Sequence, residues 1–366
     1  MRLDFKKISY IPGLDGWRAL SVMLVMLAHF GFNEVVPGGL GVTIFFFISG
    51  FLITTLLIKE RNTAGSVSIR DFYIRRFLRL MPELVAMLLI TGIYRSAMGD
   101  YQSLAEVAAA LTYTTNYFIF WVDNFSAGAL HPSWPVLWSL SVEEHYYILY
   151  PLVFSLFLTT SRRQVIFVVG VALFCLVYRT ILVKTGAAFI MSEYPYTYVA
   201  SEARFDSIVY GVALAYAMQH RPLPISNPIA FVTAGLGGGL LLLSLLIRNP
   251  EFRETARYSV QGMGLLLVFA ALYNATVWDW VIRIFEVPAL KRVGVLSYAA
   301  YLWHKEYPYL VEKLAGFSRD DFHGAAKVAY IALGIAFALA VAEISYRFVA
   351  KPCQRLRRNF GSHKPA

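Results

Sequence analysis

Residues 17–30 read Trp-Arg-Ala-Leu-Ser-Val-Met-Leu-Val-Met-Leu-Ala-His-Phe, an apolar run that contains two ionisable side chains, Arg18 and His29. In an α-helix, eleven residues turn through about 1100° and rise about 16 Å, so both side chains are expected on one stripe. Ionisable groups inside an apolar span are costly and usually mark a pathway or a reaction site. The run therefore predicts a membrane helix with chemistry inside it.

The whole chain has the composition of a membrane protein. Of its 366 residues, 58% are apolar and 15% are charged, and the mean hydropathy is +0.55, far from the mixture of a soluble domain. The net charge of +10 comes from residues between the apolar runs. This distribution indicates membrane topology and contact with the lipid bilayer, and it argues against nucleic acid. The two cysteines predict no disulfide framework.

Runs long enough to cross the hydrocarbon core recur along the chain. We expect an all-α, polytopic integral-membrane helical bundle with about ten transmembrane helices. One domain is expected over residues 1–366, with spans between about 11 and 350 and a short basic cytoplasmic tail at 351–366. The expected spans are 17–36, 40–58, 77–97, 137–158, 165–183, 204–219, 228–247, 258–277, 293–311 and 326–349. Residues 104–121 contain Thr112, Thr114, Thr115 and Asn116, which indicates a surface or re-entrant helix.

The distribution of Lys and Arg orients these spans. With ten spans and a cytoplasmic N-terminus, 21 Lys and Arg residues lie on the cytoplasmic side and 10 on the outer side. Because cytoplasmic loops carry an excess of these residues, both termini are expected in the cytoplasm. The glycine-rich run 235–239 lies inside the seventh span and lacks a preceding strand, so it predicts close helix packing and not a nucleotide loop.

Basic residues also gather at the cytoplasmic end of the third span, where Arg76 and Arg79 lie three residues apart. Such residues often orient a helix and extend to lipid headgroups. At this spacing they could also bind one phosphate group together. The sequence leaves both interpretations open.

Two further clusters place polar side chains inside apolar runs. Glu143 and Glu144 enter the fourth span after Trp138, and adjacent carboxylates are expensive there unless they line a wet or functional cavity. The spacing does not decide which of the two acts. In the ninth span Ser297, Tyr301 and His304 fall on one helical face. Arg204 and Asp206, at the outer start of the sixth span, are expected to pair with each other or to bind water.

Depth arranges these residues in two layers. His29, Glu143 and His304 each lie about 10 Å below the outer surface, at about 1.5 Å per helical residue. The arginines at positions 18, 76 and 79 lie at the cytoplasmic face. A phosphate-rich donor entering from the cytoplasm fits the inner layer, and acid–base chemistry on an acceptor hydroxyl fits the outer layer.

Together these motifs resemble the acyltransferase 3 family of bacterial inner-membrane O-acyltransferases, from about Ile11 to Lys351. The matching motifs are 14–18 with the Arg-x10-His spacing to His29, 47–52, the Arg-x-x-Arg of Arg76 and Arg79, 138–144, 204–206, and Ser297-Tyr298 through His304. Two positions differ from the family pattern. His145 stands where the family commonly has Gln, and Ala350 stands where it commonly has Glu.

The resemblance implies transfer of an acyl group, most often acetyl from acetyl-CoA, to a hydroxyl of a cell-surface or lipid-linked glycan or glycoside. It implies a multi-pass protein of the bacterial inner (cytoplasmic) membrane and no metal. In this interpretation His29 acts as the base or is transiently acylated, Glu143 or Glu144 orients it, and the donor is bound by Arg18, Arg76 and Arg79. The acceptor is then contacted by Trp138, Arg204, Asp206, Ser297, Tyr298 and His304. No fused esterase-like domain is expected. Because no serine or cysteine lies in a recognisable nucleophile motif, the sequence argues against a stable acyl-serine intermediate.

A transporter or flippase for a glycan or lipid is the alternative, with the ionisable layers forming a permeation path. We find no inverted repeat and no pair of broken helices in corresponding halves of the sequence, which argues against it. A membrane scaffold leaves the ionisable His and Glu residues unexplained. The sequence does not identify the acceptor, nor does it distinguish acetyl from succinyl or longer donors.

Overall fold

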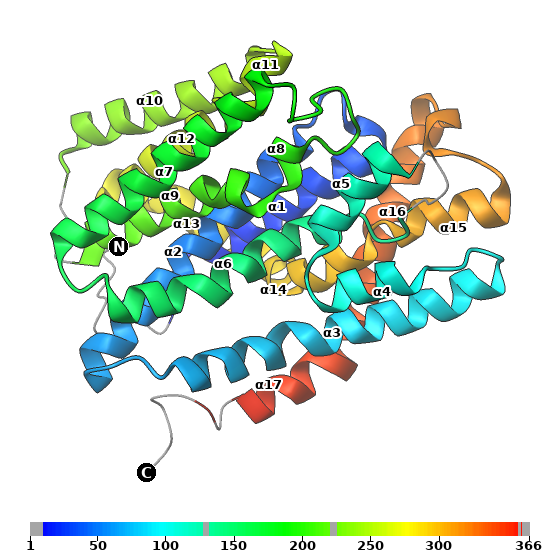
Figure 1. The fold of residues 1–366 in the computed structure, drawn as a ribbon, viewed down its shortest axis with the longest axis horizontal. Helices are drawn as coiled ribbons and strands as arrows, with labels where there is room; N and C mark the ends of the chain where they lie inside the picture. The colour runs from blue at the N-terminus through cyan, green and yellow to red at the C-terminus, as the bar shows by residue number, and fades with distance from the viewer. Residues whose placement is uncertain (1–9, 127–131, 220–224, 358–359, 361–366) are drawn as a thin grey trace. The chain divides into compact units, whose positions relative to one another are not determined.

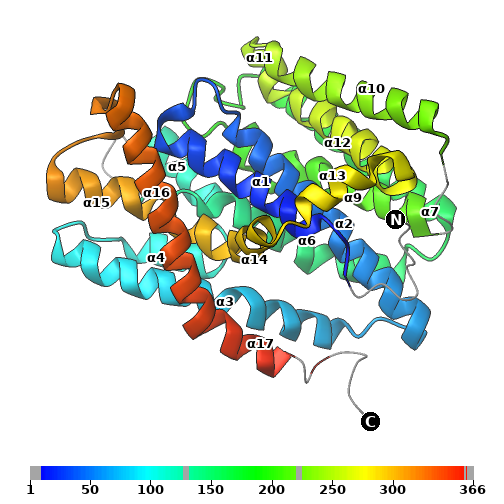
Figure 2. The ribbon, with the colours of Figure 1, turned by 180° about the vertical axis from the view of Figure 1, so that it is seen from behind.

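The computed structural model describes residues 10–126, 132–219, 225–357 and 360, and over these residues the chain forms helices and no strand (Figures 1 and 2). The prediction of an all-α fold is confirmed. By internal contacts the chain divides into two compact units. The first unit comprises Met1–Leu14, Thr43–Val67 and Thr112–Glu286. The second comprises Asp15–Val42, Ser68–Leu111 and Val287–Ala366.

Each predicted span overlaps a helix. These helices are α1 (Leu14–Leu27), α2 (Gly38–Ala64), α3 (Ile69–Ala97), α6 (Leu137–Leu156), α7 (Ser161–Lys184), α9 (Ser201–Gln219), α10 (Asn227–Leu246), α12 (Arg257–Asn274), α14 (Pro288–Trp303) and α16 (Gly324–Ser345). Among the described residues, five helical stretches are long and apolar enough to cross a membrane, namely α2, α3, α7, α10 and Gly324–Leu356. A sixth candidate is α12 followed by Thr276–Phe285, bent by 98°. The count of ten spans and the location of the termini stay predictions.

Shorter helices connect these elements. They are α4 (Leu104–Leu111), α5 (Thr115–Phe125), α8 (Tyr196–Val199), α11 (Pro250–Glu254), α13 (Asp279–Phe285), α15 (Glu306–Ala315) and α17 (Lys351–Arg357). The stretch 104–121, expected to be a surface or re-entrant helix, is divided between α4 and α5. At about 1.5 Å per residue neither of these two helices alone reaches across a bilayer.

Two predicted spans are interrupted where ionisable residues occur. Helix α1 ends at Leu27 and continues as a π-helical turn, Ala28–Phe32, which contains His29. The ninth span, expected to be continuous over 293–311, is instead two helices that meet at His304. Pro308 explains this break, because it lacks an N–H and its ring would clash with the carbonyl four residues earlier, that of His304.

Glycines allow close helix packing within each unit. A Cβ atom added at Gly50 of α2 would lie 2.0 Å from the carbonyl oxygen of Ile208 of α9. In the second unit, a Cβ at Gly294 of α14 would lie 1.9 Å from the carbonyl oxygen of Asp15. Backbones that approach this closely exclude any larger residue. The contact at Gly294 holds the N-terminal end of α1 against α14.

The glycine-rich run in α10 packs closely at one position only. A Cβ at Gly237 would lie 2.7 Å from the carbonyl oxygen of Gly264 of α12, whereas the neighbouring Gly235, Gly238 and Gly239 have nothing within 4 Å. The expected close packing is therefore confirmed at Gly237. Much of the apolar surface of α7 and α10 is exposed, with 11% and 17% of their most apolar windows buried. Such surfaces suit contact with lipid.

Candidate active site

The π-helical turn after α1 brings His29 into direct contact with a second histidine. His29 Nδ1 lies 2.8 Å from Nε2 of His304, at the C-terminal end of α14. The two rings are nearly parallel, with 15° between their planes and 5.0 Å between their centres. His304 is fully buried, while His29 is partly exposed. Single π-turns of this kind occur frequently at functional sites.

The proton positions in this pair follow from the hydrogen bond between His304 and the backbone of Tyr301. His304 Nδ1 lies 2.7 Å from the backbone carbonyl oxygen of Tyr301, which can only accept, so this nitrogen donates. In a neutral imidazole the other nitrogen then accepts, and His304 Nε2 takes its hydrogen bond from His29 Nδ1. Neutral His29 therefore carries its lone pair on Nε2. The chain of bonds selects one tautomer and directs Nε2 of His29 away from His304.

Cationic residues lie close to this histidine pair. Arg319, in the short 3₁₀ turn Arg319–Asp321, donates to the carbonyl oxygen of His29 at 3.5 Å. Lys327 of α16 has its Nζ 5.6 Å from the centre of the Phe32 ring, and a Cβ atom added at Gly31 would lie 3.2 Å from its Cε. A positively charged surrounding favours the neutral form of an imidazole and stabilises developing negative charge.

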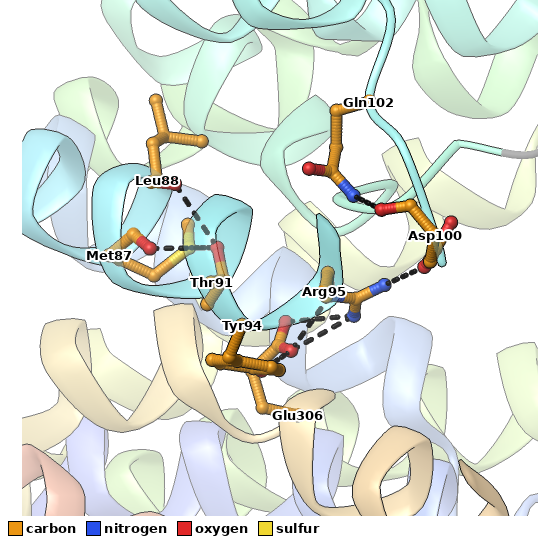
Figure 3. A network of polar contacts seen from close by, with 8 residues as sticks. All are labelled: Met87, Leu88, Thr91, Tyr94, Arg95, Asp100, Gln102 and Glu306. Carbon is orange, nitrogen blue, oxygen red and sulfur yellow. Dashed lines mark hydrogen bonds and ion pairs between the residues drawn. The ribbon is translucent and has the colours of Figure 1, made fainter. Parts of the chain in front are cut away.

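A buried ion pair fixes the start of α15, two residues beyond His304 (Figure 3). Arg95 of α3 binds both carboxylate oxygens of Glu306, with both N···O distances 3.0 Å. Tyr94 also donates to Glu306, and Arg95 reaches Asp100 at 3.2 Å. The guanidinium lies 3.7 Å from the centre of the Tyr309 ring. Bidentate contacts of this kind give strong and directional binding, so the network fixes α15 against α3.

Arg18 and Arg79 line one cavity of ≈ 200 Å³ in the second unit. The lining also includes the carboxylates Asp15 and Glu83, the latter accepting from Ser345 at 2.9 Å. Tyr298 completes the polar part of the wall, and its hydroxyl donates to the carbonyl oxygen of Leu80 at 3.0 Å. Two guanidinium groups in one cavity can bind a phosphate or pyrophosphate group.

The structure places three further predicted residues of the second unit, and their roles stay predictions. Arg76 is partly exposed on α3 and is not among the residues that line this cavity, although Arg79, one turn later, is. Tyr298, predicted to contact the acceptor, lines the cavity together with the two arginines. Ser297 is fully buried, and its hydroxyl has no hydrogen-bond partner among the described residues.

The predicted carboxylates belong to the first unit. Glu143 is partly exposed and accepts a hydrogen bond from the hydroxyl of Ser49 of α2. Glu144, the next residue of α6, is buried. Trp138, five residues before Glu143, is buried and packs on Tyr198, with 4.6 Å between the ring centres. The structure does not test which carboxylate acts.

Arg204 and Asp206 form no salt bridge with each other, so the first of the two alternatives that the sequence offered for them, mutual pairing, is wrong. Residues two apart on a helix point to different sides, and Asp206 instead binds Arg179 of α7 at 2.7 Å, with both side chains fully buried. Arg204 donates to the carbonyl oxygen of Tyr198 at 3.0 Å and lies 4.0 Å from the centre of the Tyr258 ring. Both residues are fully buried.

Sequence reasoning named both histidines but missed their hydrogen bond and the ion pair beside it. Glu306 carried a usable signal, since it is a carboxylate within the apolar run that also contains His304. Its partner Arg95 lies 211 positions away in the chain. No local pattern connects residues at that separation.

The model of one protein family, described as an acyltransferase domain, matches residues 11–347. The chain is 28% identical over 361 residues to the peptidoglycan O-acetyltransferase OatA of Listeria monocytogenes, covering 94% of this chain and 56% of that protein. It is also 28% identical over 381 residues to the O-acetyltransferase OatA of Staphylococcus aureus, covering 96% of this chain and 59% of that protein. The chain thus spans less than two thirds of these relatives. No solved structure matches it.

Proposed function

The chain belongs to the acyltransferase domain family, and we propose that it is a membrane O-acyltransferase that moves an acetyl group from cytoplasmic acetyl-CoA to a hydroxyl of a cell-surface or lipid-linked glycan or glycoside. The family and the names of the relatives support O-acyl transfer. The apolar helices support a multi-pass membrane protein, for which we propose the bacterial inner membrane.

The observation that carries this proposal is the hydrogen-bonded chain from His29 through His304 to the Tyr301 carbonyl, with distances of 2.8 Å and 2.7 Å. It leaves a lone pair on Nε2 of His29. A general base needs a neutral imidazole whose basic nitrogen is held in one orientation. His304 serves as the positioning residue that supplies this orientation.

In the proposed reaction the acceptor hydroxyl gives its proton to His29 Nε2 while its oxygen attacks the acetyl carbonyl carbon. The carbon–sulfur bond then breaks, and the CoA thiolate takes the proton from His29. While His29 is cationic, its Nδ1–H bond to His304 becomes a charge-assisted hydrogen bond and is strengthened. A two-step transfer would use the same nitrogen as the nucleophile.

We assign the phosphates of the donor to the cavity that Arg18 and Arg79 line. Its volume of ≈ 200 Å³ suits the phosphate end of the donor and not the whole molecule. In this cavity Asp15 and Glu83 balance the arginine charge when no donor is bound. His29 lies eleven residues beyond Arg18, about 16 Å along a helix, so the thioester must extend from the cavity toward it.

The test uses purified protein in detergent or liposomes, incubated with acetyl-labelled CoA and extracted surface glycan. We expect labelled glycan and free thiol, and a loss of at least about 100-fold in His29→Ala, the usual contribution of a general base. The exposed histidine His323, also in the second unit, supplies the control His323→Ala, which should keep full activity. Near-normal acetylation by His29→Ala refutes the assignment, and glycan movement without loss of acetyl-CoA supports the transporter alternative.

A further inference from the structure

A third histidine, in the first unit, is hydrogen-bonded to a serine that no sequence motif singled out. His145 of α6 has its Nδ1 2.6 Å from the Oγ of Ser201, the first residue of α9. The imidazole also forms a hydrogen bond with the backbone of Tyr113. A histidine between a hydroxyl and an orienting backbone group has the arrangement of an activated nucleophile.

The proton positions in this pair follow from the hydrogen bond between His145 and the backbone of Tyr113. The backbone carbonyl of Tyr113 can only accept, so the imidazole nitrogen facing it carries the hydrogen. The lone pair of neutral His145 then lies on Nδ1, where it can accept from the Ser201 hydroxyl, which is also hydrogen-bonded to Tyr117. This is the tautomer that a base needs in order to remove the serine proton.

The surroundings of Ser201 supply further polar contacts. Asn116 of α5 donates through Nδ2 to Ser201 Oγ at 3.1 Å and to the carbonyl oxygen of Val199 at 3.2 Å. The Oδ1 atom of the same amide is buried and has no hydrogen-bond partner among the described residues. Buried acceptors are normally satisfied, so Oδ1 is an unused acceptor near the serine to which a bound molecule could donate.

Local backbone geometry also favours chemistry at this position. Tyr113, whose backbone orients His145, has φ of 57°, a left-handed conformation that is strained for an aromatic residue and tends to occur at functional sites. Ser201 begins a helix of 19 residues, whose free N–H groups and dipole favour negative charge at that end. The Tyr117 ring stacks on His145 at 5.9 Å, and its hydroxyl donates to Glu202 at 2.7 Å.

We propose that Ser201 and His145 form an acyl-accepting dyad, which takes a small acyl group from an ester or thioester and passes it to water or to a sugar hydroxyl. His145 Nδ1 removes the serine proton as Oγ bonds to the acyl carbon, and the bond to the leaving oxygen or sulfur breaks. The leaving group takes the proton from His145. In the second half, His145 deprotonates the incoming hydroxyl, which displaces Ser201, and the proton returns to Oγ.

Burial limits what this dyad can accept. Ser201 is 2% exposed, whereas His145 is partly exposed, so an acyl donor reaches Oγ from the histidine side. An acetyl group fits this restriction better than a long acyl chain. The inference goes beyond the proposed function, because the chemistry at His29 does not require it.

The test uses the full-length protein in detergent and methanesulfonyl fluoride, a reagent of about the size of an acetyl group, which sulfonylates activated serines and releases fluoride. Tandem mass spectrometry should locate the adduct at Ser201. Ser207, on the same helix, is the internal control, because its buried hydroxyl has no hydrogen-bond partner among the described residues and should stay unmodified. His145→Gln places an amide at the position of Nε2, where it can donate to the Tyr113 backbone, but it leaves no base at the position of Nδ1, so labelling should slow by about 100-fold.

Two outcomes overturn the proposal: no adduct at Ser201 in the wild-type protein, or equal labelling of the wild type and His145→Gln. Gel filtration in detergent shows whether His145→Gln is folded. A second readout separates this proposal from the function assigned to His29. His29→Ala should lose acetyl transfer from acetyl-CoA and still label at Ser201 at the wild-type rate, so each assignment can fail without the other.

Discussion

Substitution of His304 by leucine removes the acceptor for the Nδ1–H of His29, a hydrogen bond of 2.8 Å, and keeps an apolar side chain in the buried position. We expect kcat for acetyl transfer to fall while KM for acetyl-CoA stays close to the wild-type value. The reason is that His304 contacts the base and is not among the residues that line the arginine cavity.

The size of the effect follows from the charge on His29 during the reaction. After His29 takes the acceptor proton, the lost hydrogen bond is one to a charged group, which contributes about 1.5–3 kcal/mol. At about 1.36 kcal/mol per tenfold in rate, kcat should fall by about 10- to 150-fold. Removal of the base itself, in His29→Ala, should cost more, because the proton then has no acceptor.

Two amide variants separate positioning from packing. In His304→Gln the amide oxygen can reach the place of Nε2 and accept from His29, so part of the activity should return. In His304→Asn the amide reaches only the place of Nδ1, and activity should stay low. Acetylation of a purified glycan by each variant, at matched amounts of folded protein, provides the measurement. Equal rates for Leu, Gln and Asn, or a leucine variant close to the wild type, would refute the reasoning.

Three further experiments test the cavity, the ion pair and the helix packing. Arg79→Ala should raise KM for acetyl-CoA by at least about tenfold, the effect of one lost charged hydrogen bond. Arg76→Ala should raise KM much less, because only Arg79 of the two lines the cavity. Equal increases in KM for the two variants would contradict the donor site. Glu306→Gln should cost about 1.5–3 kcal/mol of stability, since a neutral amide replaces the bidentate carboxylate of the buried Arg95 and only the ion pair to Asp100 remains. Thermal unfolding in detergent measures this loss. Gly237→Ala should destabilise the protein by about 1–3 kcal/mol through overpacking against α12. Gly238→Ala, with open space around it, should stabilise the protein by about 0.5–1 kcal/mol. Similar unfolding temperatures for the two variants would be inconsistent with the helix contact.

The positions of the helices could be predicted because they depend on local composition. Twenty apolar residues in a row indicate a helix wherever they occur in the chain, and each predicted span overlaps a helix. The prediction was wrong where one residue changes the local backbone, as at Pro308 in the ninth span. The helix break at His304 depends on which backbone hydrogen bonds can form, and hydropathy carries no information about these bonds.

Partner choice could not be predicted in the same way. Asp206 binds Arg179 on a neighbouring helix and not Arg204 two positions earlier, because helix geometry directs those two neighbours to different sides. His145 was noted only as a departure from a family pattern, and its bond to Ser201, 56 positions away, depends on how α6 meets α9.

By itself the sequence determined the class of the fold, the placement of helices and the chemical types of the candidate residues, since these follow from the identity and spacing of neighbours along one helix. Only the tertiary structure decided that His29 donates to His304, 275 positions away, and that Arg18 and Arg79 line one cavity. Such pairings depend on the register and rotation of packed helices. A shift of a single residue rotates a side chain by about 100° around its helix and would separate each pair.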